Sequence, residues 1–198
     1  MSDKQTLEVY DQKAAEYADL TENDTADRQL RCFMDALPAK ASVLDLGCGP
    51  GRSAALMAAE GHRVLATDAS AEMVALAQAH RGVTARQETF DALQGTACFD
   101  GVWANFSLLH ADRDALPRHL TAIATALKPG GVFHIGMKTG TDTKRDGLGR
   151  RYTYVTRNEL LDLLGAVGLE PCAQWEGEDL GLDGVMAEWI VLQARKHG

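Results

Sequence analysis

Three glycines at alternate positions follow a short apolar segment and form the clearest candidate for a ligand-binding loop. The segment, Val-Leu-Asp-Leu-Gly-Cys-Gly-Pro-Gly, spans residues 43–51 and carries an acid, Asp45, just before the loop. The glycines are Gly47, Gly49 and Gly51. Glycine suits positions where the backbone takes a positive φ or where a ligand approaches the main chain. A second acid, Asp68, ends the next apolar segment, residues 63–68, and two acids at the ends of neighbouring strands with glycines between them predict a nucleoside-binding site.

The spacing within this loop differs from the fingerprint of dinucleotide-binding proteins. That fingerprint is G-x-G-x-x-G, but here the third glycine comes one residue early and Arg52 stands in its place. Pro50 removes a backbone donor that a phosphate could use, and Asp45 would repel a pyrophosphate. The loop therefore disfavours NAD and favours a ligand without phosphate that has a cationic amino-acid end.

The elements that must position this loop alternate between strand and helix. The apolar pattern predicts strands near 42–46, 62–67, 83–88, 98–104, 131–137, 169–175 and 186–195. It predicts helices near 52–60, 70–80, 113–127 and 156–166, with Ser70 at a helix start. This alternation implies right-handed crossovers and a mainly parallel sheet with helices on both faces. The short connection over 176–184 predicts that the last two strands form an antiparallel hairpin at the sheet edge.

The first 38 residues predict one or two helices ahead of the sheet. Apolar and aromatic residues recur there at three- and four-residue spacing, and Asp24 or Thr25 could cap a second helix that runs to Leu37. The recurring residues are Leu7, Tyr10, Ala14, Tyr17 and Ala18. A long irregular segment, residues 139–154, follows a strand end, where functional loops of open α/β sheets gather.

Composition limits the classes of partner. The net charge of −8 and the lack of a long basic tract argue against nucleic acid and against an acidic membrane surface. No apolar run approaches the length of a membrane span, and the first residues lack the apolar core of a signal peptide. The four cysteines lie far apart, so neither a metal site nor a disulfide framework is expected. We expect a cytoplasmic protein, either a monomer or a homodimer.

Four motifs together resemble those of class I S-adenosylmethionine-dependent methyltransferases. They are residues 43–51, 66–73 (Ala-Thr-Asp-Ala-Ser-Ala-Glu-Met), 99–105 (Phe-Asp-Gly-Val-Trp-Ala-Asn) and 127–133 (Leu-Lys-Pro-Gly-Gly-Val-Phe). They occur in order and at plausible spacing, and the resemblance covers roughly residues 38–175. Residues 137–140 and 146–152 are similar to a group of small bacterial methyltransferases of unassigned substrate.

The resemblance implies a Rossmann-like fold with a seven-stranded, mostly parallel sheet and one antiparallel edge strand. It implies a single methyltransferase domain over 1–198, with residues 1–38 as a helical cap over the cofactor cleft and 39–198 as the α/β core. The implied reaction is methyl transfer from S-adenosylmethionine to an oxygen, nitrogen or sulfur of a small molecule, giving S-adenosylhomocysteine. Two alternatives stay open: an NAD-dependent oxidoreductase, and a non-catalytic module that binds S-adenosylmethionine.

The resemblance also implies the residues that hold the cofactor. The glycine loop would pass under the adenosine and methionine moieties, and Asp68 would bind both ribose hydroxyls. Asp91 would meet the adenine amino group, with Phe90 or Ala92 beside it and Glu88 as an alternative. The expected cofactor contacts are Tyr10, Tyr17, Asp45, Gly47, Cys48, Gly49, Gly51, Asp68, Ala69, Met73, Asp91, Ala92, Asn105 and Phe106. Core packing explains Met73 and the Tyr10–Tyr17 spacing equally well.

His110 is the best candidate for a general base, because residues 105–110 leave a strand at the cofactor end of the sheet. The alternative is a histidine that packs or lines the substrate mouth. The long loop and its neighbour supply further candidate substrate residues, namely Lys138, Arg150, Arg151 and Tyr152. Arginine binds carboxylate or phosphate in a bidentate manner, which would indicate an anionic acceptor, and solvated surface charge is the other interpretation. Asp142 and Asp146 alone are too few ligands to predict a metal.

Overall fold

A seven-stranded sheet forms the centre of the molecule. The structure is a computed structural model that describes residues 3–20 and 25–198. The strand order is β3-β2-β1-β4-β5-β9-β8. The strands are β1 (Ser42–Leu46), β2 (Arg63–Asp68), β3 (Val83–Gln87), β4 (Phe99–Ala104), β5 (Leu127–Lys138), β8 (Leu169–Leu180) and β9 (Met186–Lys196). All seven predicted strands are present, and β5 and β8 are longer than predicted.

One reversed strand breaks the parallel order, as predicted, but it does not lie at the edge. β9 runs antiparallel to both β5 and β8, and it lies between them. β8 arrives through a helical crossover from β5 and therefore runs parallel to it, and the hairpin returns β9 into the space between the two. The hairpin was correctly predicted to form the edge of the sheet, whereas its outermost strand is β8.

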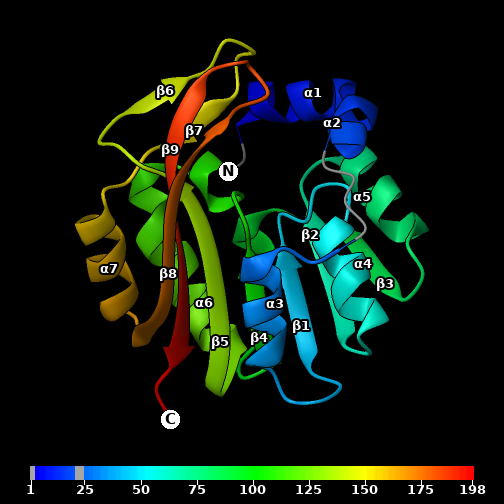
Figure 1. Ribbon diagram of the computed structural model, residues 1–198, viewed down its shortest axis with the longest axis vertical. Coiled ribbons are helices and arrows are strands. Elements are labelled where there is room, and N and C mark those ends of the chain that lie inside the picture. Colours follow the sequence, from blue (N-terminus) through cyan, green and yellow to red (C-terminus); the bar gives the residue numbers. More distant parts are fainter. Residues whose placement is uncertain (1–2, 21–24) are drawn as a thin grey trace.

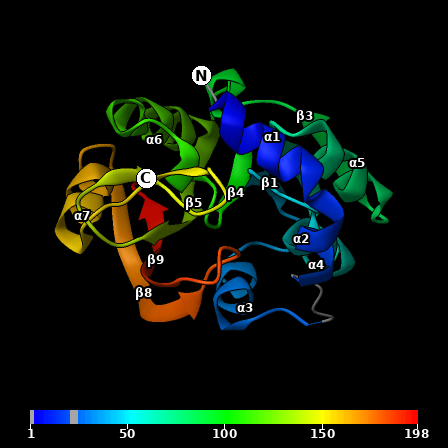
Figure 2. The same ribbon diagram turned by 90° about the horizontal axis from the view of Figure 1, so that it is seen from above.

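Helices cover both faces of the sheet (Figure 2). They are α1 (Lys4–Gln12), α2 (Ala14–Leu20), α3 (Arg28–Asp35), α4 (Arg52–Ala59), α5 (Ala71–Ala79), α6 (Leu116–Ala126) and α7 (Arg157–Gly165), with 3₁₀ turns at Phe90–Ala92, Leu108–His110 and Arg113–Ala115. Successive residues of β1 point to opposite cores, because side chains alternate along a strand. Val43 packs with residues of α3 and α4, and Leu44 packs with residues of α6 and α7. The site at the strand ends thus rests on a layer packed from both sides.

Helix caps agree in part with the sequence. The Ser70 side chain accepts from the backbone N–H of Met73 and begins α5, as predicted. The helix before the sheet begins later than expected, because Asp27, not Thr25, accepts from the N–H of Leu30 and caps α3. Asp24, the other expected cap, lies outside the described residues.

The N-terminal helices lie at the carboxyl ends of the parallel strands (Figure 1). The segment 139–154, expected to be irregular, contains a two-stranded antiparallel ribbon, β6 (Thr143–Arg145) and β7 (Arg151–Thr153). Figure 1 shows this ribbon at the same end of the molecule as α1. Both segments therefore border the end of the sheet where ligands of open α/β folds bind.

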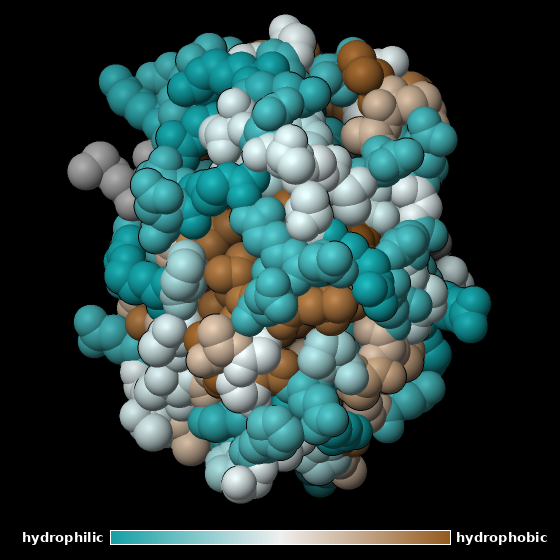
Figure 3. All heavy atoms as spheres, turned by 90° about the vertical axis from the view of Figure 1, so that its left-hand side faces the viewer, coloured by the Kyte–Doolittle hydropathy of each residue, from teal (hydrophilic) through white to brown (hydrophobic). Residues whose placement is uncertain are grey.

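The surface is mostly hydrophilic. Figure 3 shows one side of the molecule, where hydrophilic side chains surround apolar ones near the centre. The exposed large apolar side chains among the described residues are Leu180, Val185 and Met186, at the tip of the β8–β9 hairpin. Within residues 3–20 and 25–198, no helix has the length and apolar character needed to cross a bilayer.

Candidate active site

A cavity of about 540 Å³ opens at the carboxyl ends of β1, β2 and β4, and α1 and α2 contribute to its wall. Twelve of the predicted site residues line it. They are Tyr10, Tyr17, Asp45, Gly47, Cys48, Gly49, Asp68, Ala69, Met73, Asn105, Phe106 and His110. They come from segments up to a hundred residues apart, so the fold gathers most of the predicted site in one place.

The glycine loop forms the floor of this cavity. The N–H groups of Gly47 and Cys48 both donate to the carbonyl of Thr67, at 2.7 and 2.9 Å, and this ties the loop to the end of β2. Gly47 has φ of +74°, and a Cβ there would lie 2.3 Å from Cβ of Ser107. The glycine thus permits both the turn and the close approach of the segment that follows β4.

Asp68 joins the loop to the end of β2. One carboxylate oxygen accepts from the N–H of Gly49 and the other from the N–H of Ser70, each at 2.9 Å. Burial raises the pKa of this carboxyl, although the backbone N–H donors act to lower it. Each carboxylate oxygen has a second lone pair. The side chain lines the cavity and can therefore accept two more hydrogen bonds from a ligand.

Asp45 is the second acid of the floor, and it is 2% exposed. Its Oδ2 has no hydrogen-bond partner within the described part of the chain. Burial, followed by the nearby charge of Asp68, raises the pKa of Asp45 to about 7. A buried carboxylate oxygen without a partner is unfavourable unless a donor or a cation compensates it. The cavity floor thus fits a cationic group of a ligand.

Asn105 is oriented by a buried polar chain that the sequence did not reveal. Its Oδ1 lies 3.0 Å from Nε2 of His134, and Nδ1 of His134 lies 3.3 Å from the amide nitrogen of Gln193. These contacts place the imidazole proton on Nε2, since an amide oxygen accepts and an amide nitrogen donates. The Gln193 amide also donates to the carbonyl of Gln29. Because its oxygen is held by His134, Asn105 keeps its NH₂ group for other acceptors.

His110 pairs with Tyr10 at the wall of the cavity. Nδ1 of His110 lies 2.7 Å from the carbonyl of Arg151, so this nitrogen carries the proton of the neutral ring. Nε2 then accepts from the Tyr10 hydroxyl at 2.8 Å. Burial lowers the pKa of His110 to about 4, so the ring is neutral at pH 7. The arrangement presents a neutral proton acceptor in contact with a tyrosine hydroxyl.

Three predicted cofactor residues do not line the cavity. Gly51 has φ of +83° and lies against α5, where a Cβ would be 2.6 Å from Cα of Ala77. Asp91 and Ala92 are exposed in the 3₁₀ turn after β3, and Asp91 pairs with Arg118 at 2.6 Å. Glu88, the alternative that the sequence left open, lines the cavity together with Thr89 and Phe90. Of the two acids that the sequence left open at this point, the cavity wall thus contains Glu88 and not Asp91, which lies three residues further along the chain.

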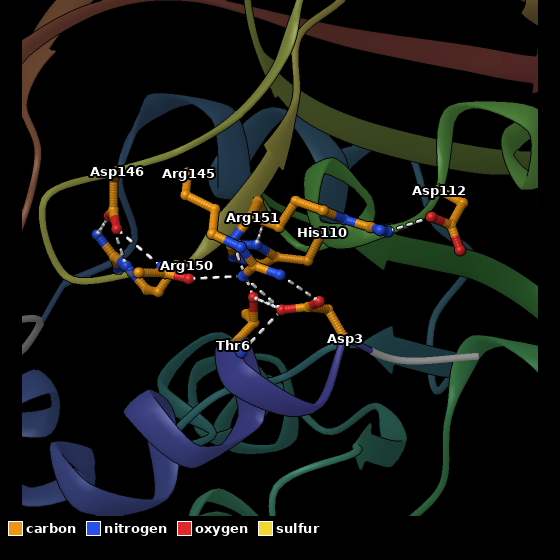
Figure 4. A network of polar contacts seen from close by, with 9 residues as sticks. Asp3, Thr6, His110, Asp112, Arg145, Asp146, Arg150 and Arg151 are labelled. Atoms are coloured by element: carbon orange, nitrogen blue, oxygen red, sulfur yellow. Dashed lines mark hydrogen bonds and ion pairs between the residues drawn. The ribbon is translucent and has the colours of Figure 1, made fainter.

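The predicted substrate arginines have partners within the protein (Figure 4). Arg150 is 2% exposed and forms an ion pair with Asp146 at 2.6 Å. Arg151 pairs with Asp112. Neither arginine lines the cavity. The expectation that these arginines face a substrate is not supported by the structure, because aspartates on the same side of the molecule hold them.

Lys138 and Tyr152 also lie outside the cavity wall. The Lys138 ammonium lies 4.2 Å from the centroid of the Tyr152 ring, and the Arg150 guanidinium lies 5.3 Å from the same centroid. Arg150 also lies 5.5 Å from the ring of Tyr10, which does line the cavity. Through the rings of Tyr10 and Tyr152, these cation–π contacts stabilise the cavity wall.

Several lining residues had no signal strong enough to find them. Asp3 and Thr6 precede or begin α1, and contacts of this helix with elements distant in sequence bring them to the cavity. Trp103 is 2% exposed and stacks on His134 with 3.5 Å between ring centroids, yet it also lines the cavity. Trp103 stands two residues before Asn105 at the end of a strand, and this position in the sequence could have predicted that it lines the cavity.

Comparison with known proteins shows what the chain is similar to. Residues 43–131 match the family described as "Methyltransferase domain", and this match contains the glycine loop, Asp68 and Asn105. The chain thus resembles class I S-adenosylmethionine-dependent methyltransferases over the part that carries its motifs. Its sheet, with one reversed strand and helices on both faces, is the Rossmann-like fold of this family.

Two curated methyltransferases resemble part of the chain. Malonyl-[acyl-carrier protein] O-methyltransferase of Enterobacter lignolyticus is 36% identical over 117 residues, which are 56% of this chain and 45% of that protein. Trans-aconitate 2-methyltransferase of Azoarcus sp. is 36% identical over 138 residues, which are 67% of this chain and 51% of that protein. The chain thus spans about half the length of these relatives.

A solved methyltransferase structure matches almost the whole chain. It is the Burkholderia thailandensis 1,6-didemethyltoxoflavin-N1-methyltransferase with bound 1,6-didemethyltoxoflavin and S-adenosylhomocysteine. The TM-score is 0.79 at 28% sequence identity, and the match covers 98% of this chain and 88% of that one. The likeness therefore includes the N-terminal helices and the ribbon as well as the motif-bearing core.

Proposed function

We propose that this chain transfers a methyl group from S-adenosylmethionine to an oxygen, nitrogen or sulfur nucleophile of a small molecule. The observation that carries the proposal is a pair of acids, the buried Asp45 and the half-buried Asp68, which line one cavity from either side of the glycine loop. Asp68 offers two acceptor positions to a ribose, and the unpartnered Oδ2 of Asp45 suits a cation. S-adenosylmethionine has a ribose, a sulfonium and an ammonium, so the cavity floor fits it.

The cavity residues divide into two proposed groups. Asp68, Ala69, Met73, Glu88 and Phe90 would hold the adenosine moiety. The rest of the floor would hold the amino-acid end: Asp45, Gly47, Cys48, Gly49, Asn105 and Phe106. Support comes from the position of the first group at the ends of β2 and β3 and of the second at the ends of β1 and β4.

The proposed mechanism depends mainly on positioning and on exclusion of water. The bound cofactor supplies a methyl group already activated by a positive sulfur. Tyr10 and Tyr17 from the N-terminal helices and Phe106 from the segment after β4 line the same cavity, so they can keep water out and orient an acceptor. His110 would take the acceptor's proton by way of the Tyr10 hydroxyl, which donates to its unprotonated Nε2.

We further propose that residues 1–38 act as a helical cap on a core of residues 39–198, within a single domain. The contacts of Asp3, Thr6 and Tyr10 with the ribbon and with His110 support a cap whose position is fixed by the core. A cytoplasmic location agrees with four cysteines that form no disulfide. Light scattering after size-exclusion chromatography would decide between the proposed monomer and homodimer.

Methyl transfer itself is tested with cofactor labelled in its methyl group. The purified chain would be incubated with the labelled cofactor and a metabolite mixture, and labelled products would be identified by mass spectrometry. A labelled small molecule, formed together with S-adenosylhomocysteine, is the expected result. Cofactor binding without any transfer across broad mixtures would favour a binding module, and stabilisation by NAD instead would favour an oxidoreductase. Neither alternative has support from the comparisons.

A further inference from the structure

The charge of the cavity wall bears on the acceptor. Among the described residues, the acids that line the cavity are Asp3, Asp27, Asp45, Asp68 and Glu88. Among the described residues that line the cavity, one has a cationic side chain: Arg52, at the start of α4 beside the glycine loop. Asp3 is paired with Arg145, and the other four acids still outnumber Arg52. A wall with this balance attracts a cationic cofactor and disfavours a second ligand that carries carboxylates.

Three arginines near the Tyr10–His110 pair already form ion pairs. Figure 4 shows three arginines of the ribbon segment converging on this region, each directed at an aspartate. Arg145 donates to both oxygens of Asp3, at 2.9 and 2.8 Å. The other two ion pairs, Arg150 with Asp146 and Arg151 with Asp112, complete the set. Placing a substrate carboxylate on any of these arginines would first require breaking an existing pair.

The hydrogen-bond order at the pair is fixed. Because the Arg151 carbonyl holds the proton of His110 on Nδ1, Tyr10 must donate to Nε2. The Tyr10 oxygen can then accept, and the Arg150 guanidinium lies 3.3 Å from it on one side. Tyr10 lines the cavity, so an N–H or O–H group of a ligand can approach this oxygen beside its contacts with Arg150 and Tyr152. A carboxylate has no proton to donate. It would face the Tyr10 oxygen, whose own proton is already donated to His110.

Aromatic side chains shape the same part of the wall. The rings of Tyr10 and Tyr17 meet edge to face with centroids 5.8 Å apart, and Tyr10 meets His110 at 5.3 Å. Phe106 is held at φ of +51°, a conformation that a bulky residue adopts only when its surroundings require it. Gly136 makes this possible, since a Cβ there would lie 3.1 Å from the Phe106 nitrogen. Flat apolar surfaces of this kind suit a planar ligand.

We infer that the methyl acceptor is an uncharged, planar molecule that presents an N–H or O–H group to the Tyr10–His110 pair. The ribbon arginines are structural and do not bind a substrate anion. This inference rests on the proposed function, and it replaces the anionic acceptor that the arginine-rich sequence suggested.

Methyl transfer to such an acceptor balances in protons and electrons at the Tyr10–His110 pair. The acceptor's nitrogen or oxygen forms the new bond to the methyl carbon, and the carbon–sulfur bond breaks with its electrons left on sulfur. The acceptor's proton passes to the Tyr10 oxygen as Tyr10 gives its own proton to Nε2 of His110. The low pKa of His110, caused first by burial, makes it a weak base. A weak base suffices where the methylated acceptor, still protonated, is a strong acid, as for a phenol or a lactam nitrogen.

Matched probes that differ only in charge test the inference. The protein is first saturated with S-adenosylhomocysteine, and this step is measured separately, so its failure would count against the proposed function and not against the acceptor class. Calorimetric titrations then compare orotamide with orotate and salicylamide with salicylate. Each pair is planar, and its members differ in a carboxamide or a carboxylate. We expect an uncharged member to bind at least about tenfold more tightly than its carboxylate in one pair or both.

Tyr10→Phe removes the hydroxyl that would accept from the probe, and we expect it to lower the affinity for the uncharged probe several-fold. Tyr154→Phe is the matched control, because it removes a tyrosine hydroxyl from a residue that does not line the cavity. Equal or tighter binding of a carboxylate, or the failure of both uncharged probes to bind, would overturn the inference. An equal effect of the two tyrosine variants would also contradict it.

Discussion

At the scale of single residues, Asp68 is the side chain whose loss should be felt most directly by the cofactor. Asp68→Ala removes both proposed acceptors of the ribose hydroxyls. Charged hydrogen bonds of this kind contribute about 1–3 kcal/mol, so we expect the dissociation constant of S-adenosylhomocysteine to rise by roughly 5- to 150-fold. Calorimetric titration gives this number.

Asp91→Ala is the control for this variant. It removes the same charge from a residue that the sequence also placed at the adenine but that lies outside the cavity and pairs with Arg118. Its affinity for the cofactor product should match that of the unmodified chain. A loss of affinity equal to that of Asp68→Ala would show that net charge, and not the ribose contact, is being measured.

Asp45 should make cofactor binding depend on pH. Burial and the charge of Asp68 raise its pKa to about 7, and the thiol of Cys48 lies beside it. A cationic ligand lowers this pKa, so binding releases a proton and tightens as the pH rises through 7. We expect the affinity for S-adenosylhomocysteine to fall by up to about tenfold for each unit of pH below 7. Asp45→Asn should bind weakly with little pH dependence; the same pH dependence in this variant would assign it to another group.

At the scale of elements, the third glycine of the loop packs against a helix and does not line the cavity. Gly51 begins α4 in a left-handed conformation, directly against α5. Gly51→Ala adds a Cβ that would lie 2.6 Å from the backbone of Ala77. Gly130→Ala meets the same kind of backbone strain, φ of +75°, but with nothing within 4 Å. We expect about 1–2 kcal/mol for Gly130→Ala and clearly more for Gly51→Ala, measured by thermal unfolding. Equal losses would show that the contact with α5 relaxes freely.

The N-terminal helix α1 is attached to the ribbon by side chains far apart in the chain. Asp3 binds Arg145, and the hydroxyl of Thr6 accepts from the N–H of Arg151 at 2.9 Å. Arg145→Ala removes one attachment, which is worth at most about 1 kcal/mol because the arginine is partly exposed. We expect amide hydrogen exchange over residues 4–12 to become up to about fivefold faster. Arg157→Ala, whose ion pair with Glu176 lies on α7 and β8, should leave this exchange unchanged, and an equal effect would contradict the attachment.

At the scale of the whole molecule, local sequence patterns were enough to predict the strands of the sheet and the acids and glycines of the cavity floor. Strand ends and glycine spacing depend on neighbours in sequence, so the positions of Asp45 and Asp68 followed from the motifs. The partners of the arginines did not, because the contact between Asp3 and Arg145 joins residues 142 positions apart. The place of β9 likewise depends on how the hairpin fits beside β5, which periodicity within one strand does not encode.

The most direct test of the central claim is calorimetric titration of the purified chain with S-adenosylhomocysteine. Asp45, Asp68 and the glycine loop predict saturable binding at one site per chain, weakened in Asp68→Ala while circular dichroism shows the fold intact. A folded chain that binds neither S-adenosylhomocysteine nor S-adenosylmethionine would contradict the account.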